Sequence, residues 1–563
     1  MKKVLTVLFV LFSIFILASL FLSYFQQDEW HSFGVLQSYG KSIYLNSSDN
    51  YLDFFYGRPG SRLIMMSLFE FFQTNAYAFG IFSAGVHILN STLVFLVTLK
   101  LSKNRTISYI AAFFFLINSV ASQSYMWFGT MASSLPSVTF SLFSIYFYID
   151  FLRSRELKHI LLSLIFLFTS FMFKEGGYAL FITFPIIWFI YTDKKSLKKF
   201  LKENFPILAL GVLNTWIFVN DFLFIPGERA NYIASSQSGL IKLLGHLVSY
   251  PLEGFSQIFT PAPLIFGIAR QATRFFFPLL TPDTPDFDLF YTTRAAEAVS
   301  LLATFVLAAF IIVLYRGFKK NISSIYLKTL IISLALTIFS FIPFVILDKS
   351  DAYLDSRYYY PSLLGASIFL GTFLLVIFEN LREKSLKKIA LTLLILFFAY
   401  HALSLGRDLL SQTEVSQERI KIVRTITDTV PSLKDKTVFY VSGDSGGYYA
   451  LPELKVPFQS GLGQMLMVIY DDPEIHPFFK EETLLKTLDG GFLYDTIAQG
   501  YRESGKRGFG YFTDKDKLED TILKFNIDIS ESVFAFYYRS DSKTLVNITN
   551  DFRKQIEEDL NQR

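Results

Sequence analysis

The stretch that decides the fold is the apolar run from Val4 to Tyr24, VLTVLFVLFSIFILASLFLSY, which is followed closely by Gln27-Asp-Glu-Trp-His31. About 20 apolar helical residues span the hydrocarbon of a bilayer, so this run predicts a membrane-spanning helix. A Lys-Lys start before an apolar stretch is also typical of a secretory signal, but the apolar core of a signal is shorter, roughly 7–15 residues. We therefore expect an uncleaved span, with Asp28 and Glu29 where the chain leaves the membrane.

Composition places the whole chain in the membrane class. Hydrophobic residues make up 52% of it, 64 of the 563 residues are Phe, and the apolar residues come in long blocks. The net charge of +4 is small and gives no support for nucleic-acid binding. The absence of cysteine excludes disulfides, thiolate zinc sites and cysteine nucleophiles. The sequence predicts a polytopic α-helical membrane protein.

Ten further apolar runs follow the first, which gives about eleven transmembrane helices. They lie at roughly 76–101, 106–121, 133–152, 158–173, 176–192, 205–225, 296–315, 324–347, 361–379 and 387–405.

Basic residues cluster in alternate connections, as expected for loops on the cytoplasmic side. The clusters are Lys2 and Lys3; Lys100, Lys103 and Arg105; Arg153, Arg155 and Lys158; Lys194, Lys195, Lys198, Lys199 and Lys202; Arg316, Lys319 and Lys320; and Arg382, Lys384, Lys387 and Lys388. This pattern predicts a multi-pass protein of the cell membrane with a cytoplasmic N-terminus and an extracytoplasmic C-terminal part.

The sequence predicts two domains. Residues 1–405 form the membrane domain, with a first external loop at 25–75 and a large external loop at 226–295. An amphipathic piece, Arg62 to Thr74, is too short to cross and is expected along the membrane surface. The prolines of 226–295 favour surface-lying helices and loops over a clean span.

Residues 406–563 differ in composition from the rest, being more charged. Runs such as Thr437–Val441 and Val533–Tyr538 are typical of strands. We expect a soluble α+β domain outside the membrane.

Charged side chains gather in the connections predicted to be external. The carboxylates are Asp28, Glu29, Asp49, Asp53, Glu175, Asp348, Asp351 and Asp355. The cations include Arg58, Arg62, Lys174, Lys349 and Arg357. Sugar transfer from a polyprenyl phosphate needs a base for the acceptor hydroxyl and cations for the departing phosphate, and these loops supply both.

Two of the cations have simpler interpretations that remain open. Lys174 and Glu175 follow an apolar span, and an exposed ion pair capping a tight hairpin would explain them. Arg357 lies in Asp355-Ser-Arg-Tyr-Tyr-Tyr-Pro361, where an aromatic belt with a snorkelling arginine would suffice. A guanidinium that binds phosphate oxygens bidentately is the alternative.

His87 falls one helical turn from Asn90 on an apolar span, so the two side chains share a face. A structural hydrogen-bonding role between helices is favoured over catalysis. No His, Asp and Glu set has the spacing of metal ligands, so no metal site or other cofactor is expected. Asp28, Glu29 and His31 could still meet a divalent cation by chance.

Other function classes remain open at this point. A transporter or lipid flippase of cell-envelope precursors would place ionisable groups near the bilayer midplane, often in two related halves. Here the strong charges gather at the outer boundary and the halves differ. A non-catalytic scaffold or sensor that displays its C-terminal domain is a third class.

An ordered set of motifs resembles the GT-C superfamily of polyprenyl-phosphate-sugar-dependent glycosyltransferases, especially protein O-mannosyltransferase-like members and aminoarabinose transferases. The resemblance covers roughly residues 1–190 and 340–380. The motifs are Asp28-Glu29, Tyr56-Gly-Arg-Pro59, His87-Ile-Leu-Asn90, Lys174-Glu175 and Ser356-Arg-Tyr-Tyr-Tyr-Pro361. The 226–295 and 406–563 segments match no family pattern.

The resemblance implies an inverting glycosyltransferase that uses a polyprenyl-phosphate sugar on the non-cytoplasmic side. It implies a catalytic acidic residue in the first external loop, matching Asp28 as general base with Glu29 beside it. The acceptor, whether protein, lipid or glycan, is not implied.

The resemblance also implies an Arg-Tyr element near the donor phosphate, matching Arg357 and Tyr358, and basic loop residues matching Arg58 and Lys174. The positions expected to support them are Glu175, His87 and Asp355.

Overall fold

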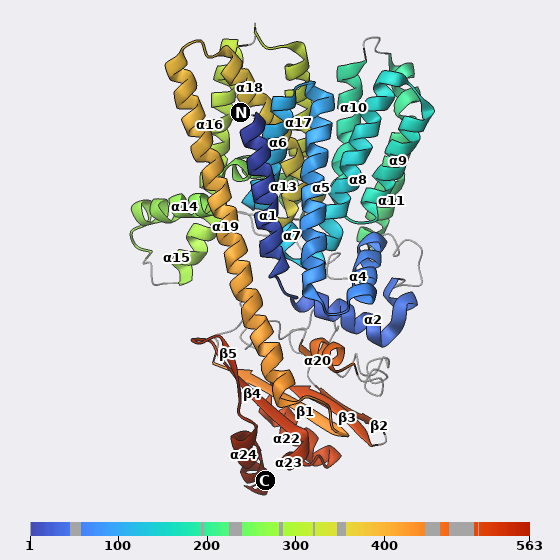
Figure 1. Cartoon of the computed structure of the whole chain (residues 1–563), viewed down its shortest axis with the longest axis vertical. Helices are drawn as coiled ribbons and strands as arrows, with labels where there is room; N and C mark the ends of the chain where they lie inside the picture. The colour runs from blue at the N-terminus through green and yellow to red at the C-terminus, as the bar shows by residue number, and fades with distance from the viewer. Residues whose placement is uncertain are drawn as a thin grey trace. The chain divides into compact units, whose positions relative to one another are not determined.

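Apolar helices make up most of the computed structural model (Figure 1). The structure describes residues 2–45, 58–192, 196–224, 239–280, 285–318, 321–345, 356–444, 462–471, 500–504 and 506–562. The chain divides into two compact units. One comprises Met1–Leu20, Asp49–Ser61 and Gly80–Leu410, and the other comprises Phe21–Ser48, Arg62–Phe79 and Ser411–Arg563.

Each predicted apolar run coincides with a helix. The helices are α1 (Lys2–Phe21), α5 (Ala76–Ser102), α6 (Arg105–Ile117), α8 (Phe128–Ser154), α9 (Leu157–Phe171), α10 (Ala179–Tyr191), α11 (Leu197–Phe224), α16 (Ala296–Phe318), α17 (Ser324–Phe339), α18 (Tyr360–Asn380) and α19 (Lys384–Thr429). Among the described residues, seven helices are long and apolar enough to cross a membrane: α1, α5, α8, α16 with its preceding turns, α17, α18 and α19. The helical, multi-span class predicted from the sequence is confirmed, whereas the number of crossings stays a prediction.

Small residues allow the apolar helices to approach one another closely. A Cβ atom at Gly365 of α18 would lie 2.4 Å from the backbone nitrogen of Thr337 and 2.5 Å from the carbonyl oxygen of Ser333, both on α17. Between α8 and α9, the hydroxyl of Ser170 donates to the carbonyl of Ser137 at 2.8 Å. Ser144 donates in the same way to Ser163. These polar contacts fix the register of neighbouring helices where lipid offers no hydrogen bonds.

The 226–295 segment holds α13 (Gly239–Phe259), α14 (Ala262–Phe276), α15 (Pro285–Phe290) and a π-helical turn, η3 (Tyr291–Ala295). Surface-lying helices were expected throughout, but α13 packs against α16, α17 and α18. Its buried polar side chains explain the difference, because Ser256 donates to the carbonyl of Ser300 at 2.8 Å and Gln257 to the Ser300 hydroxyl at 3.0 Å.

Short helices connect the apolar helices at the predicted external side. They are η1 (Ser119–Ala121), α7 (Gln123–Met126), η2 (Glu175–Tyr178), η4 (Ile342–Phe344) and η5 (Ser356–Tyr358). The η5 turn contacts η1 and α7, and η2 contacts η4. Segments far apart in the sequence therefore meet within this unit.

The second unit contains a five-stranded sheet with the order β2-β3-β1-β4-β5. The strands are β1 (Lys436–Gly443), β2 (Gly500–Ser504), β3 (Arg507–Phe512), β4 (Val533–Arg539) and β5 (Thr544–Asn547). The β1 strand is parallel to β3 and to β4, with Val438 opposite Gly510 and Val533, and both outer pairs are antiparallel. The two predicted strands are thus β1 and β4, which lie side by side.

Helices α22 (Lys515–Phe525), α23 (Ile529–Ser532) and α24 (Thr549–Gln562) accompany the sheet. Alternate strand residues point to opposite faces. On one face, Val438, Phe512 and Ala535 form a buried core with Ile522 of α22 and Ile556 of α24. The predicted α+β character of residues 406–563 is confirmed, but whether they fold alone stays a prediction.

The second unit also contains α2 (Gln27–Leu45), most of α4 (Pro59–Phe72) and α20 (Leu462–Tyr470). The sequence predicted a loop where α2 lies. An aromatic cluster explains this helix, because Trp30 and Phe33 are buried against Phe25, and Phe33 stacks on Phe69 at 4.4 Å between ring centroids. The same helix also packs against α20.

Candidate functional site

Arg58 and Glu175 form a bidentate ion pair between two connections that are 117 positions apart. The Nη2 atom of Arg58 lies 2.7 Å from Oε1 and 3.1 Å from Oε2 of Glu175, and its Nε atom lies 3.2 Å from Oε1. The backbone of Arg58 is left-handed, with φ of 53°. The next turn is fixed because the amide of Gly60 donates to the carbonyl of Met172 at 2.9 Å.

The pair keeps Glu175 ionised. Burial by itself raises the pKa of Glu175, but the charge and hydrogen bonds of Arg58 outweigh it and hold this pKa below its ordinary value of 4.5. Glu175 therefore contributes a fixed negative charge beside Arg58 at neutral pH.

Lys174 is buried, with 3% of its surface exposed, so an exposed ion pair capping a hairpin does not describe it. Its Nζ atom donates to the hydroxyl of Ser134 at 2.7 Å and lies 5.2 Å from the ring centroid of Tyr358. The Ser137 hydroxyl donates to the Lys174 carbonyl at 3.2 Å. A lysine held in this way presents a positive charge at the end of α8 rather than in bulk water.

The guanidinium of Arg357 lies near two aromatic rings. Its guanidinium carbon lies 5.1 Å from the ring centroid of Trp127 and 5.2 Å from that of Tyr358. Its backbone is fixed to the opposite turn, because Ser124 donates to the Arg357 carbonyl at 3.2 Å and Ser356 donates to the Val120 carbonyl at 2.6 Å.

The structure thus brings together five of the residues singled out from the sequence. They are Arg58, Lys174, Glu175, Arg357 and Tyr358. Several of the other residues singled out lie outside the described residues, namely Asp49, Asp53, Asp348, Lys349, Asp351 and Asp355, as does the side chain of His31.

His87 lies in the interior of the bundle and is fully buried. Its Nε2 atom lies 3.2 Å from the carbonyl of Leu116, which can only accept, so Nε2 carries the proton. Its Nδ1 atom then accepts from the hydroxyl of Tyr360 at 2.9 Å, and that hydroxyl accepts from Asn90 at 3.1 Å. His87 and Asn90 are thus joined through Tyr360, in a contact between α5 and α18.

Asp28 and Glu29 both lie in the first turn of α2 but differ in their surroundings. Asp28 is exposed, whereas Glu29 is fully buried. The Glu29 carboxylate accepts from the backbone amide of Gln26 at 2.6 Å, which is one half of a capping box. This contact fixes the start of the helix that presents Asp28.

Sequence reasoning missed two neighbours of the cations, Ser134 and Trp127. Ser134 occurs in a run of small residues typical of helix packing, and no local signal marks it. Trp127 directly precedes α8, and an aromatic residue at the end of a span is a weak signal for a membrane boundary.

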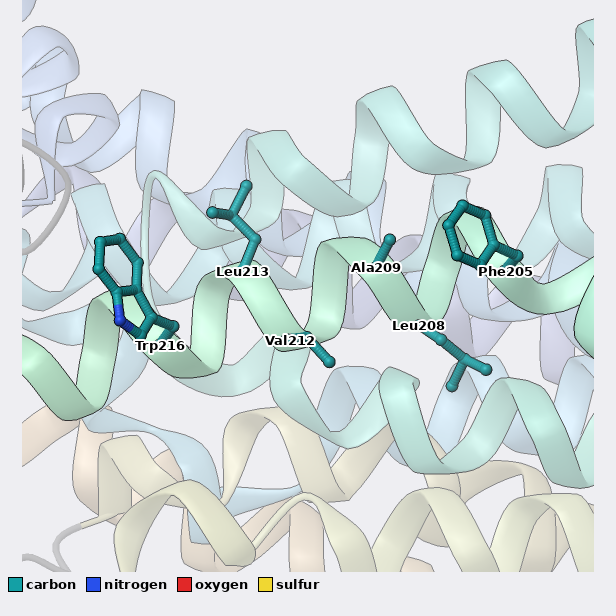
Figure 2. A pocket seen from close by; sticks show the side chains of 6 residues that line it. All are labelled: Phe205, Leu208, Ala209, Val212, Leu213 and Trp216. Carbon is teal, nitrogen blue, oxygen red and sulfur yellow. The ribbon is translucent and has the colours of Figure 1, made fainter.

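A groove of about 510 Å³ runs along one face of α11 (Figure 2). The lining is entirely apolar and consists of Phe205, Leu208, Ala209, Val212, Leu213 and Trp216. The hydroxyl of Tyr178, at the end of η2, donates to the carbonyl of Asn214 at 2.9 Å, so one end of the groove adjoins the turn that carries Glu175.

No three His, Asp or Glu side chains within the described ranges are placed to hold a metal ion together.

Comparisons with solved structures found nine similar chains, two of which are described below. No family model and no curated protein matches the sequence. The fold is similar to a crystal structure of the Archaeoglobus fulgidus oligosaccharyltransferase in the apo form, with 12% identity and a TM-score of 0.44 over 83% of this chain. It is also similar to the oligosaccharyltransferase AglB of the same organism in complex with an inhibitory peptide and a dolichol-phosphate, with 13% identity and a TM-score of 0.39 over 83% of this chain. The chain spans 64% of the length of each.

Proposed function

We propose that the chain is a membrane glycosyltransferase that moves a sugar from a polyprenyl-phosphate donor to an acceptor hydroxyl. The supporting observation is the gathering of Arg58, Lys174 and Arg357 from three distant connections around Glu175 and Tyr358. A phosphate that departs with the electron pair of the broken bond gains charge in the transition state. Cations fixed beforehand stabilise that charge without reorganisation.

The cations have different roles in this proposal. Arg357, oriented by Trp127 and Tyr358, binds two phosphate oxygens through its planar fork. Lys174 adds a compact charge whose position is fixed by Ser134. Arg58 and Glu175 fix the turn that carries Lys174.

The apolar groove on α11 supports a lipid-linked donor over a water-soluble one. Its Trp216 end adjoins η2 through the contact of Tyr178 with Asn214. A prenyl chain in this groove would place the phosphate end of the lipid at the cations.

Asp28 is proposed as the general base because of its residue type and its place in the sequence. It takes the proton of the acceptor hydroxyl, whose oxygen forms a bond to the anomeric carbon. The bond from that carbon to the phosphate oxygen breaks, and polyprenyl phosphate leaves with the electron pair. A single displacement of this kind inverts the anomeric configuration. Glu29 fixes the helix start that bears Asp28.

The proposed reaction takes place on the non-cytoplasmic side, with the N-terminus in the cytoplasm. The basic clusters support this orientation. The acceptor is a hydroxyl of a protein, a lipid or a glycan, and residues 406–563 are proposed to select it.

The test uses the full-length protein in proteoliposomes with a radiolabelled polyprenyl-phosphate sugar and lipid and protein extracts as acceptors. Replacement of a general base lowers rates by about 10²- to 10⁴-fold, so Asp28→Asn should reduce transfer by that factor and leave thermal unfolding unchanged. Asp516→Asn, at an exposed carboxylate of α22, is the matched control.

The product configuration, measured by NMR, gives a second readout. Retention would contradict a single displacement. Translocation of a fluorescent polyprenyl phosphate without any sugar transfer would favour a lipid flippase, the second candidate.

A further inference from the structure

Helix α14 differs in direction from the long apolar helices of its unit. In Figure 1, α14 runs roughly horizontally, whereas α16 runs roughly vertically. Its 15 residues extend about 22 Å, which is less than the roughly 30 Å of bilayer hydrocarbon. Arg270 and Arg274 lie on it and are exposed. Its direction and its exposed arginines distinguish it from a membrane span and from a buried core helix.

Only a narrow stripe of α14 packs against the protein. Its buried residues are Ile265, Ala269 and Thr273, and the first two pack against Ala296 at the start of α16. This stripe, together with the partly buried Phe266, fixes α14 to the first turn of an apolar helix.

The flank beside this stripe is apolar and exposed. Leu264, Ile268 and Phe275 are 43%, 48% and 79% exposed, and they recur at the spacing of one helical face. Phe276 and Leu279 extend the apolar surface beyond the helix end, with 69% and 95% exposed. Aromatic and aliphatic side chains exposed to this degree are typical of helices that lie in a membrane interface.

The opposite flank carries positive charge. The guanidinium carbon of Arg270 lies 5.8 Å from the ring centroid of Tyr291, and that of Arg274 lies 6.0 Å from the ring centroid of Phe287. These rings hold both cations on one side of the helix. Basic residues in this position attract anionic lipid head groups.

We infer that α14 lies in the interface of the bilayer, with Leu264, Ile268 and Phe275 among the acyl chains and Arg270 and Arg274 binding anionic phospholipid head groups. A protein partner would also cover an apolar flank. The bilayer is favoured because α14 is attached to the end of a helix long enough to span it, and because its apolar and basic flanks are segregated.

Because the chain has no cysteine, a single nitroxide label can be placed anywhere on it. The experiment uses the full-length protein in nanodiscs and compares Ile268→Cys with Gly267→Cys. A side chain at Gly267 would meet no other atom within 4 Å and would lie outside the apolar flank. Asp516→Cys, in the C-terminal part, reports full exposure to water.

The label at position 268 should be accessible to oxygen and protected from a water-soluble nickel chelate, and the label at 267 should be less protected. Protection at 268 no greater than at 516 would overturn the inference. If the label at position 268 is protected in detergent solution only when another protein is bound, α14 binds a protein partner. This result would also overturn the inference.

The charge component has a separate readout. When the protein is taken from nanodiscs of mixed phosphatidylcholine and phosphatidylglycerol, the anionic phosphatidylglycerol should copurify with it. The double variant Arg270→Gln, Arg274→Gln should reduce its affinity by roughly tenfold or more. The control Arg316→Gln, Arg382→Gln removes two exposed arginines elsewhere and should change it little. Equal losses in both variants would show that the head-group site is wrong.

Discussion

The ion pair of Arg58 and Glu175 allows a quantitative test of what holds the cation cluster together. Arg58→Met leaves the Glu175 carboxylate, whose side chain is 18% exposed, without its bidentate partner. Glu175→Gln removes the negative charge and keeps the shape of the side chain. Breaking a fully buried pair costs about 3–5 kcal/mol, and a surface pair contributes about 0.2–1 kcal/mol. Because 34% of the Arg58 side chain is exposed, solvent screening places this pair between those limits. We expect a coupling energy of about 2 kcal/mol.

A double-mutant cycle measured by SDS unfolding in mixed micelles tests this value. Arg58→Met should cost more than Glu175→Gln, and the double variant should be more stable than Arg58→Met alone. Additive effects of the two substitutions would refute the reasoning, because they would mean that the contacts at 2.7–3.2 Å contribute no coupling.

The same pair predicts the direction of a pH effect. The pKa of Glu175 is lower in the folded protein than its ordinary value of 4.5, so its stabilisation is complete above that value and is lost as the pH falls through the folded pKa. The difference in unfolding free energy between wild type and Glu175→Gln should therefore shrink in acid. A constant difference from pH 7 to pH 3 would contradict the assignment.

Three further substitutions test other contacts. Glu29→Ala removes the cap at the start of α2 and should lower the stability of that helix by about 1 kcal/mol, measured as faster amide exchange. Glu29→Gln keeps an acceptor oxygen, so its α2 amides should exchange more slowly than those of Glu29→Ala. Gly365→Ala forces a methyl group into the backbone of α17 and should destabilise by about 3 kcal/mol in SDS unfolding, whereas Gly85→Ala, which meets nothing within 4 Å, should be tolerated. Tyr360→Phe removes a buried hydroxyl with two partners and should cost about 1–3 kcal/mol, against little change for the more exposed Tyr400→Phe.

The helical part of the fold could be predicted because a bilayer leaves few alternatives. Every backbone group in hydrocarbon needs an internal hydrogen bond, so long apolar runs become helices whatever their tertiary contacts. The strands β1 and β4 were evident for a similar reason, since buried parallel strands give continuous runs of β-branched and aromatic residues.

Helix α2 could not be predicted because its buried aromatic residues pack against partners that are distant in the sequence. Phe33 stacks on Phe69, and no local sequence pattern predicts a contact 36 positions away. The packing of α13 against α16 was not predicted, because Ser256 and Gln257 are polar and their partner Ser300 is more than 40 positions away.

The cluster of cations was partly predictable. Lys174 and Arg357 both lie in connections that the sequence predicts to be external, together with Arg58. Their immediate surroundings were not predictable, because Ser134 meets Lys174 through the packing of α8 against η2, and Trp127 meets Arg357 from a connection more than 200 residues away. Glu29 as a helix cap was missed because Gln26 precedes the helix where Ser or Thr usually signals a capping box.

The second unit is built from both ends of the chain, and this has a consequence for biosynthesis. Residues 62–79 leave the ribosome about 330 residues before residue 411, which at roughly 5–20 residues per second is a delay of about 20–70 s. During that interval Phe33 already has Trp30, Phe69 and Phe79 as neighbours, but the residues of α2 that pack against α20 have nothing to cover them. A nascent chain that stalls before α20 would expose this surface, and membrane chaperones would be expected to bind there.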